Sequence, residues 1–138
     1  MKEIPYYRCT LKDVNRNLST GITRVEGYEK DSQELHFHCK NGSIVTFYHE
    51  QECCESVWLE DGDGLASEVD IFTNCDWCEF EVVEKGNGDG VQQLDKYDDS
   101  YTWTFYKFRT NKGYDTIRWY GTSNGYYSER VDFKILEN

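Results

Sequence analysis

The stretch that decides the fold class covers residues 34–49 and reads ELHFHCKNGSIVTFYH. Apolar and polar residues alternate on both sides of Asn41-Gly42, and such alternation is typical of strands with one buried face. Asn-Gly between two alternating runs is a strong hairpin signal, because a type I′ turn needs two residues that tolerate positive φ. The sequence therefore predicts an antiparallel hairpin.

A two-residue turn would place Lys40 opposite Ser43 and so fix the pairing along the whole hairpin. In that register one face carries the better core residues, which are Leu35, Phe37, Cys39, Ile44, Thr46 and Tyr48. The opposite face carries all three histidines, His36, His38 and His49. A shift of one residue would separate His49 from the other two.

Further strands are predicted over residues 79–83, 101–109, 114–120 and 126–136, the last three joined as a meander by short glycine-containing turns. Short helical elements are expected over residues 65–71 and 11–18, and two segments rich in Gly and Asp, residues 60–64 and 86–100, are expected to be loops. We expect a single all-β domain over residues 1–138, an antiparallel β-sandwich or β-roll with at most one or two short helices. Residues 1–20 would form an N-terminal arm or short helical element packed on it.

Two details of the C-terminal strands bear on the core. Alternation predicts that Val131, Phe133 and Ile135 face the core while Arg130, Asp132 and Lys134 face water. Along residues 101–108 the aromatic residues occupy odd positions up to Phe105 and even positions from Tyr106, so they change from one strand face to the other. Either a β-bulge lies there or the strand is covered on both faces. Four residues are expected to fill the core, namely Trp103, Phe105, Ile117 and Trp119.

Composition restricts the class of partner. The formal net charge of −11 repels phosphate backbones, which argues against direct nucleic-acid binding but permits a basic protein surface or a cation. No apolar run approaches the length of a membrane span, and residues 1–10 lack the apolar core of a signal peptide. Without an export signal the six cysteines are expected to be reduced, in a cytoplasmic protein.

The histidines and cysteines suggest metal chemistry in two ways. His36, His38 and His49 on one face could hold Zn²⁺ with a position open for water, as in a metal-dependent hydrolase. Alternatively a structural zinc site could combine His49 and Cys53 or Cys54 with Cys75 or Cys78, since Cys-x-x-Cys can supply two thiolates. The simpler interpretation is half-exposed histidines and buried thiols that pack as small apolar groups.

A third candidate is a binding surface on the C-terminal strands. Arginine, tyrosine and tryptophan dominate binding hot spots through large contact area and stacking. The residues proposed for this surface are Arg109, Arg118, Tyr120, Tyr126, Tyr127 and Arg130. Such a surface would suit a host protein or a small anionic ligand, with homo-oligomerisation left open and no cofactor required.

The chain carries two specific motifs. The first is YHEQECCESV (residues 48–57), continuing to Glu60-Asp61; the second is SYTWTFYK (residues 100–107), continuing with TIRWYG (116–121) and SNGYYS (123–128). Together they resemble the pattern of an uncharacterised family of small phage and prophage proteins. The resemblance covers residues 22–133, with an uncertain alignment across residues 66–99. It implies that His49, Cys53, Cys54 and Glu55 belong to the family pattern.

The same resemblance implies a phage-encoded protein that acts in the bacterial cytoplasm. It also implies that His36, His38, Cys75 and Cys78 are peculiar to this chain, which weakens both metal hypotheses. Small accessory phage proteins often bind host machinery or defence components. We therefore expect a non-enzymatic binding protein, either a counter-defence inhibitor or a scavenger of a small ligand, with the zinc protein and the metal-dependent hydrolase as alternatives.

Overall fold

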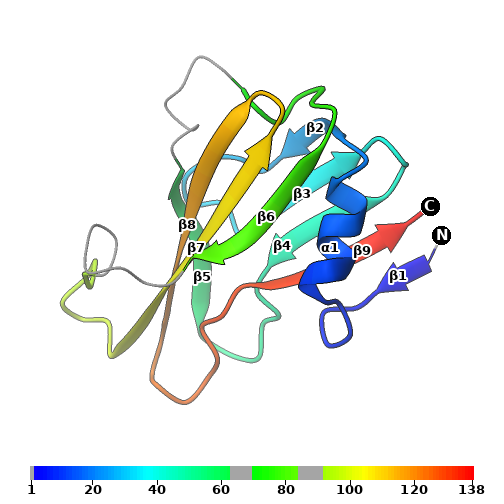
Figure 1. The fold of residues 1–138 in the computed structure, drawn as a ribbon. Helices are drawn as coiled ribbons and strands as arrows, with labels where there is room; N and C mark the ends of the chain where they lie inside the picture. Colours follow the sequence, from blue (N-terminus) through cyan, green and yellow to red (C-terminus); the bar gives the residue numbers. More distant parts are fainter. Residues whose placement is uncertain (1, 63–69, 84–91) are drawn as a thin grey trace.

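The computed structural model describes residues 2–62, 70–83 and 92–138, which form two antiparallel sheets packed face to face (Figure 1). One sheet has the order β1-β9-β4-β3-β2 and the other β5-β8-β7-β6. The elements are β1 (Lys2–Ile4), α1 (Leu11–Leu18), β2 (Ile22–Glu26), β3 (Glu34–Cys39), β4 (Ile44–Tyr48), β5 (Ser56–Gly62), β6 (Cys78–Val83), β7 (Ser100–Thr110), β8 (Gly113–Ser123) and β9 (Asp132–Glu137). The prediction of an all-β antiparallel fold is confirmed.

The main core lies between the sheets and is rich in aromatic rings. Phe37 on β3 and Phe47 on β4 meet Phe80 on β6 and Phe108 on β7, with ring centroids 5.2 Å apart for Phe37–Phe108 and for Phe47–Phe80. All four side chains are buried. Aromatic rings bury a large apolar area per residue, so they compensate for the scarcity of Leu, Ile and Val.

Helix α1 closes the core beside β6 and confirms the helical element expected near the N-terminus (Figure 1). A capping box starts it, because the Thr10 hydroxyl accepts a hydrogen bond from the Asp13 N–H at 3.1 Å and the Asp13 carboxylate accepts one from the Thr10 N–H at 3.0 Å. The Asn15 side chain donates to the Phe80 carbonyl at 3.0 Å and accepts from the Phe80 N–H at 2.7 Å. Asn15 therefore pairs with the open edge of β6 as a neighbouring strand would.

The hairpin of β3 and β4 forms as predicted, but its predicted register is wrong by one residue. His36 lies opposite Thr46 and His38 opposite Ile44, and Cys39 donates to the Ser43 carbonyl at 2.9 Å. The turn holds three residues rather than two, and Gly42 takes the left-handed conformation (φ 88°) that such a turn requires. As a result Val45 and Phe47, rather than Ile44 and Thr46, join the core.

Strand β7 carries no bulge and is covered on both faces. Its pairing with β8 runs without a shift from Ser100↔Ser123 to Thr110↔Gly113. Tyr106 and Phe108 belong to the main core, whereas Trp103 and Phe105 belong to a second cluster with Tyr120 on the outer face. All four residues that were expected to fill a core are buried, although in two separate clusters: Trp103, Phe105, Ile117 and Trp119.

The predicted C-terminal meander is wrong after β8. Strands β7 and β8 form a hairpin, but the chain then crosses to the other sheet, where β9 pairs with β4 and β1. Gly121 permits this crossing, because a Cβ there would lie 2.5 Å from the Glu129 carbonyl oxygen. Asp132, expected to face water, is buried and accepts hydrogen bonds from the Glu50 N–H and from the Arg130 side chain.

Two further predictions concern loops and a helix. Residues 60–62, expected in a loop, complete β5, and residues 63–64 lie outside the described part. The expected helix over residues 65–71 falls mostly on residues outside the described part, and residues 70 and 71 are not helical. Within residues 2–62, 70–83 and 92–138, no helix has the length and apolar character needed to cross a membrane.

Candidate functional site

A pocket of about 220 Å³ opens at the end of the sandwich where β5 begins and β8 ends. Three segments distant in sequence build it: the β4–β5 loop, residues 97–99 before β7, and the end of β8 with the connection to β9. Its lining residues are Cys54, Glu55, Tyr97, Asp98, Asp99, Thr122, Ser123, Asn124 and Tyr127. No lysine or arginine is among them.

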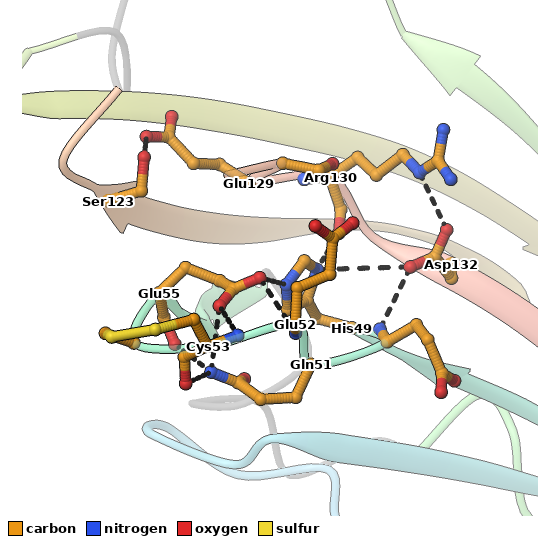
Figure 2. Close-up of polar contacts among 12 residues, drawn as sticks. His49, Gln51, Glu52, Cys53, Glu55, Ser123, Glu129, Arg130 and Asp132 are labelled. Carbon is orange, nitrogen blue, oxygen red and sulfur yellow. Dashed lines mark hydrogen bonds and ion pairs between the residues drawn. A yellow bond between two sulfur atoms is a disulfide. The ribbon is translucent and has the colours of Figure 1, made fainter. Parts of the chain in front are cut away.

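The Glu55 carboxylate organises the β4–β5 loop (Figure 2). It accepts hydrogen bonds from the backbone N–H of Cys53 at 2.8 Å and of Glu52 at 3.1 Å, and from the Gln51 amide at 3.1 Å. Burial alone would raise the pKa of Glu55, but hydrogen bonds from His49 and from these N–H groups outweigh it and lower the pKa to about 2. This carboxylate therefore stays ionised and serves as a structural anchor.

His49 lies beside this carboxylate with its side chain only 4 % exposed. Its Nδ1 contacts the Arg130 carbonyl oxygen at 2.7 Å and its Nε2 contacts a Glu55 carboxylate oxygen at 3.0 Å, as Figure 2 shows. Both partners only accept hydrogen bonds, so both ring nitrogens donate and the ring is the positively charged imidazolium. A ring with both nitrogens engaged in this way has no lone pair left for a metal or for proton abstraction.

Cys53 and Cys54 form a disulfide, so the expectation that all six cysteines are reduced is wrong for this pair. Adjacent residues point to opposite faces only within a strand. Here both cysteines lie in a bend between β4 and β5, where their side chains turn to the same side. Cys54 contributes to the pocket wall.

The opposite wall rests on the outer aromatic cluster of β7 and β8. The Tyr120 hydroxyl donates to the Asp98 carboxylate at 2.6 Å and accepts from the Leu94 N–H at 3.2 Å. The Trp103 indole donates to the Gln92 carbonyl at 2.9 Å. Burial first, and the bond to Asp98 second, raise the pKa of Tyr120 to about 12, so its hydroxyl remains a donor. These bonds fix residues 92–98 over the sheet.

The third side is held by Glu129, which is buried behind the end of β8. Its carboxylate accepts hydrogen bonds from Thr102 at 2.7 Å and from the hydroxyl of Ser123, a pocket residue. The Asn124 side chain accepts from the Tyr126 N–H at 2.9 Å. The pocket thus has a rigid frame on all three sides.

The charge of the pocket comes from Asp98 and Asp99, because the charge of Glu55 is balanced by the His49 imidazolium. Two tyrosines complete the wall: Tyr97, which is 79 % exposed, and Tyr127, which is half-buried. The Lys96 ammonium already lies 5.0 Å from the Tyr97 ring centroid. Carboxylates together with aromatic faces suit a cationic group.

The residues predicted as one binding surface do not form one. Tyr120 is fully buried beneath residues 92–98, and Arg109 on β7 pairs with Glu79 on β6 at 2.9 Å. Arg118 lies over the Phe105 ring on the outer face of β8, at 6.0 Å from the centroid. Arg130 donates to Asp132 at 2.9 Å. Of the six residues only Tyr127 lines the pocket, with the exposed Tyr126 packed edge-on against it.

His49 is separated from His36 and His38, as the corrected register requires. His36 contacts Thr46 at 2.8 Å and Glu34 at 3.2 Å, and His38 contacts Glu26. His49 belongs to the network around Glu55 instead. In the part of the chain that the structure describes, no three His, Cys, Asp or Glu side chains are grouped to hold a metal ion.

The residues proposed for a structural zinc site lie at opposite ends of the sandwich, with His49, Cys53 and Cys54 at one end and Cys75 and Cys78 at the other. Cys78 is paired with Thr110 at one end of β7. Ser56, next to the Cys53–Cys54 loop, is paired with Thr122, and Thr122 is in turn paired with Tyr101 at the other end of β7. At roughly 3.3 Å per strand residue these ends are about 30 Å apart. Cys75 and Cys78 are buried core residues, and burial raises the pKa of both thiols.

A family model described as "Domain of unknown function (DUF7448)" matches residues 14–133, which is most of the chain. The chain belongs to the DUF7448 family. No curated protein and no solved structure matches it. The predicted membership of an uncharacterised family is therefore confirmed, whereas a phage origin remains a prediction.

In this DUF7448 protein the pocket residues before β7 were not predicted from the sequence. Tyr97, Asp98 and Asp99 lie in the segment that was expected to be a loop, and nothing local indicates that this loop folds back over the outer face of β8. The sequence offered one signal for this cover, namely that Trp103, Phe105 and Tyr120 share one face of the two paired strands. Three large outward rings need a cover, and residues 92–98 provide it.

Proposed function

We propose that this DUF7448 protein is a non-enzymatic binding protein that receives lysine or arginine side chains of a basic partner protein in the pocket between Tyr97 and Tyr127. The observation that carries the proposal is the lining itself, which combines two tyrosines with the carboxylates of Asp98 and Asp99 and includes no basic residue. The net charge of −11 adds long-range attraction for a basic surface.

Magnitudes favour a protein over a small cation. An exposed cation–π contact contributes about 0.5–1 kcal/mol and an exposed ion pair about 0.2–1 kcal/mol. Two of each sum to about 1.4–4 kcal/mol, which at most reaches the roughly 4 kcal/mol that corresponds to a millimolar Kd. A single ammonium group would therefore bind weakly, and useful affinity needs a partner that supplies several basic groups and a larger buried surface.

The resemblance to phage proteins supports a host protein as this partner and a counter-defence inhibitor as the role. The scavenger of a small anionic ligand is less well supported, because carboxylates line this pocket and would repel an anion. No zinc site and no hydrolytic metal site is proposed, since the histidines and cysteines needed for them lie apart.

The test measures the affinity of a short dye-labelled oligolysine peptide by fluorescence anisotropy. Asp99→Asn and Tyr97→Ala change exposed residues, so the fold should survive, and each should weaken binding about threefold. Glu29→Gln and Tyr7→Ala are matched controls, because both residues are exposed and neither lines the pocket. If Glu29→Gln and Asp99→Asn weaken oligolysine binding equally, only the net charge matters, and the pocket would be rejected as the binding site.

A further inference from the structure

The Cys53–Cys54 pair differs from the other cysteines in its exposure. Both of its residues are exposed, whereas Cys39, Cys75 and Cys78 are buried and Cys9 is half-buried. Burial raises the pKa of Cys39 to about 11, which keeps that thiol protonated and unreactive at neutral pH. Thiol–disulfide exchange in the folded protein is therefore directed to one position, the β4–β5 loop.

Hydrogen bonds fix the chain on the N-terminal side of this disulfide. The Cys53 N–H donates to Glu55 at 2.8 Å, and its carbonyl accepts from the Gln51 amide at 2.9 Å. The same amide donates to the Glu55 carbonyl at 2.6 Å. None of these bonds involves a sulfur atom, so the loop keeps its anchor when the disulfide opens. The disulfide links the side chain of Cys54, on the pocket wall, to this fixed residue.

We propose that the Cys53–Cys54 disulfide is a reversible redox site that sets the shape of the pocket and thereby its affinity for the basic partner, a role that rests on the proposed function. In the predicted cytoplasmic setting an exposed disulfide is of the redox-active rather than the structural kind. The reductant is a dithiol. Its thiolate attacks one sulfur, the protein S–S bond breaks, and a mixed disulfide forms.

The second thiol of the reductant then displaces the remaining protein sulfur. The protein gains two electrons and two protons as a pair of thiols, and the reductant leaves as its own disulfide. Opening the small ring of adjacent residues frees Cys54 to rotate. The part of the wall that Cys54 forms, beside Glu55 and Asn124, becomes mobile. Binding of a partner must then order this part of the wall, which costs conformational entropy and lowers the affinity.

The redox step is tested by equilibrating the whole protein with mixtures of oxidised and reduced dithiothreitol. The reaction is then quenched with acid, free thiols are alkylated, and mass spectrometry counts the labels on each cysteine. We expect Cys53 and Cys54 to gain two labels together at a midpoint independent of protein concentration, while Cys39, Cys75 and Cys78 stay unlabelled without denaturant. Cys9→Ser should leave the titration unchanged. The proposal would be overturned if Cys53 and Cys54 remained free thiols even in excess oxidised dithiothreitol, or if they formed disulfides between chains.

The effect on the pocket is tested without any ligand by comparing amide NMR spectra of the two redox forms. Reduction should shift the signals of pocket residues outside the disulfide, such as Asp99 and Asn124, and leave those of α1 in place. Shifts confined to residues 53 and 54 would overturn the switch even if the redox titration succeeds. This readout stays valid if the oxidised protein fails to bind oligolysine, a result that would reject the proposed function alone.

Where the oxidised protein binds the oligolysine peptide, reduction should weaken binding about threefold. The Cys53→Ser/Cys54→Ser double variant should bind like the reduced protein and should not respond to dithiothreitol. An affinity that is equal in both redox forms would overturn the switch.

Discussion

The Glu55 carboxylate lies 3.0 Å from Nε2 of His49, and this contact joins the end of β4 in one sheet to the start of β5 in the other. The same His49 ring donates to the Arg130 carbonyl on the connection to β9. One buried ion pair thus holds together the two loops that flank the pocket. The β4–β5 loop depends on charge rather than on apolar packing for its shape.

Removing His49 should destabilise the protein strongly. In His49→Ala the Glu55 carboxylate loses its counter-ion while still buried, and breaking a buried pair in this way costs about 3–5 kcal/mol. Urea denaturation followed by tryptophan fluorescence measures the loss. His38→Ala is the control, because Glu26, its partner, is half-exposed and the expected loss is much smaller. Similar losses in both variants would contradict the role given to His49.

The stability should depend on pH through Glu55. Its pKa is about 2 in the folded protein against 4.5 ordinarily, so the folded state favours the ionised carboxylate. That stabilisation is complete above the ordinary value and is lost as the pH falls from about 5 towards 2. Urea midpoints of wild type and Glu55→Gln should therefore differ most near neutral pH and converge as the pH falls. A difference in urea midpoint that stays constant over this pH range would contradict the lowered pKa of Glu55.

Asn15 should contribute to stability through the edge of β6. Asn15→Ala removes two hydrogen bonds and leaves the Phe80 N–H and carbonyl without these partners, which should cost about 2 kcal/mol. Asn15→Asp keeps the acceptor for the Phe80 N–H but loses the donor, so its loss should be intermediate. Chemical denaturation orders the three proteins, and an Asn15→Ala variant as stable as wild type would show that water replaces the amide at no cost.

Tyr120 should act as a positioning residue for the pocket. Tyr120→Phe removes the hydroxyl that holds Asp98 and Leu94, so both stability, by about 1 kcal/mol, and oligolysine affinity should fall. Tyr106→Phe is the matched control, because its hydroxyl donates to the Val131 carbonyl in the main core, away from the pocket. Loss of affinity in both variants would indicate a general effect of stability rather than positioning.

Local sequence signals predicted the secondary structure well where the decisive interactions are local. Asn41-Gly42 between alternating runs predicted the hairpin of β3 and β4, and residues 11–18 formed the expected helix. The register failed because a two-residue and a three-residue turn share the same Asn-Gly signal. Only the packing of Val45 and Phe47 against the opposite sheet distinguishes them.

The candidate site could not be predicted in the same way, because its residues come from segments separated by tens of positions. The sequence predicted a binding role for Tyr127 and placed His49, Cys53, Cys54 and Glu55 in one motif. It could not indicate that Tyr97 and Asp99 lie across a pocket from Cys54, nor that the adjacent cysteines are bonded.

By itself the sequence determined the all-β class, the acidic surface and the existence of most strands, because alternation, turn residues and charge act over a few neighbouring positions. Tertiary structure alone decided the destination of β9, the burial of both faces of β7 and the ion pair of His49 and Glu55. These features depend on which distant surfaces bury each other's apolar rings and pair each other's charges, and short-range patterns carry no record of that choice.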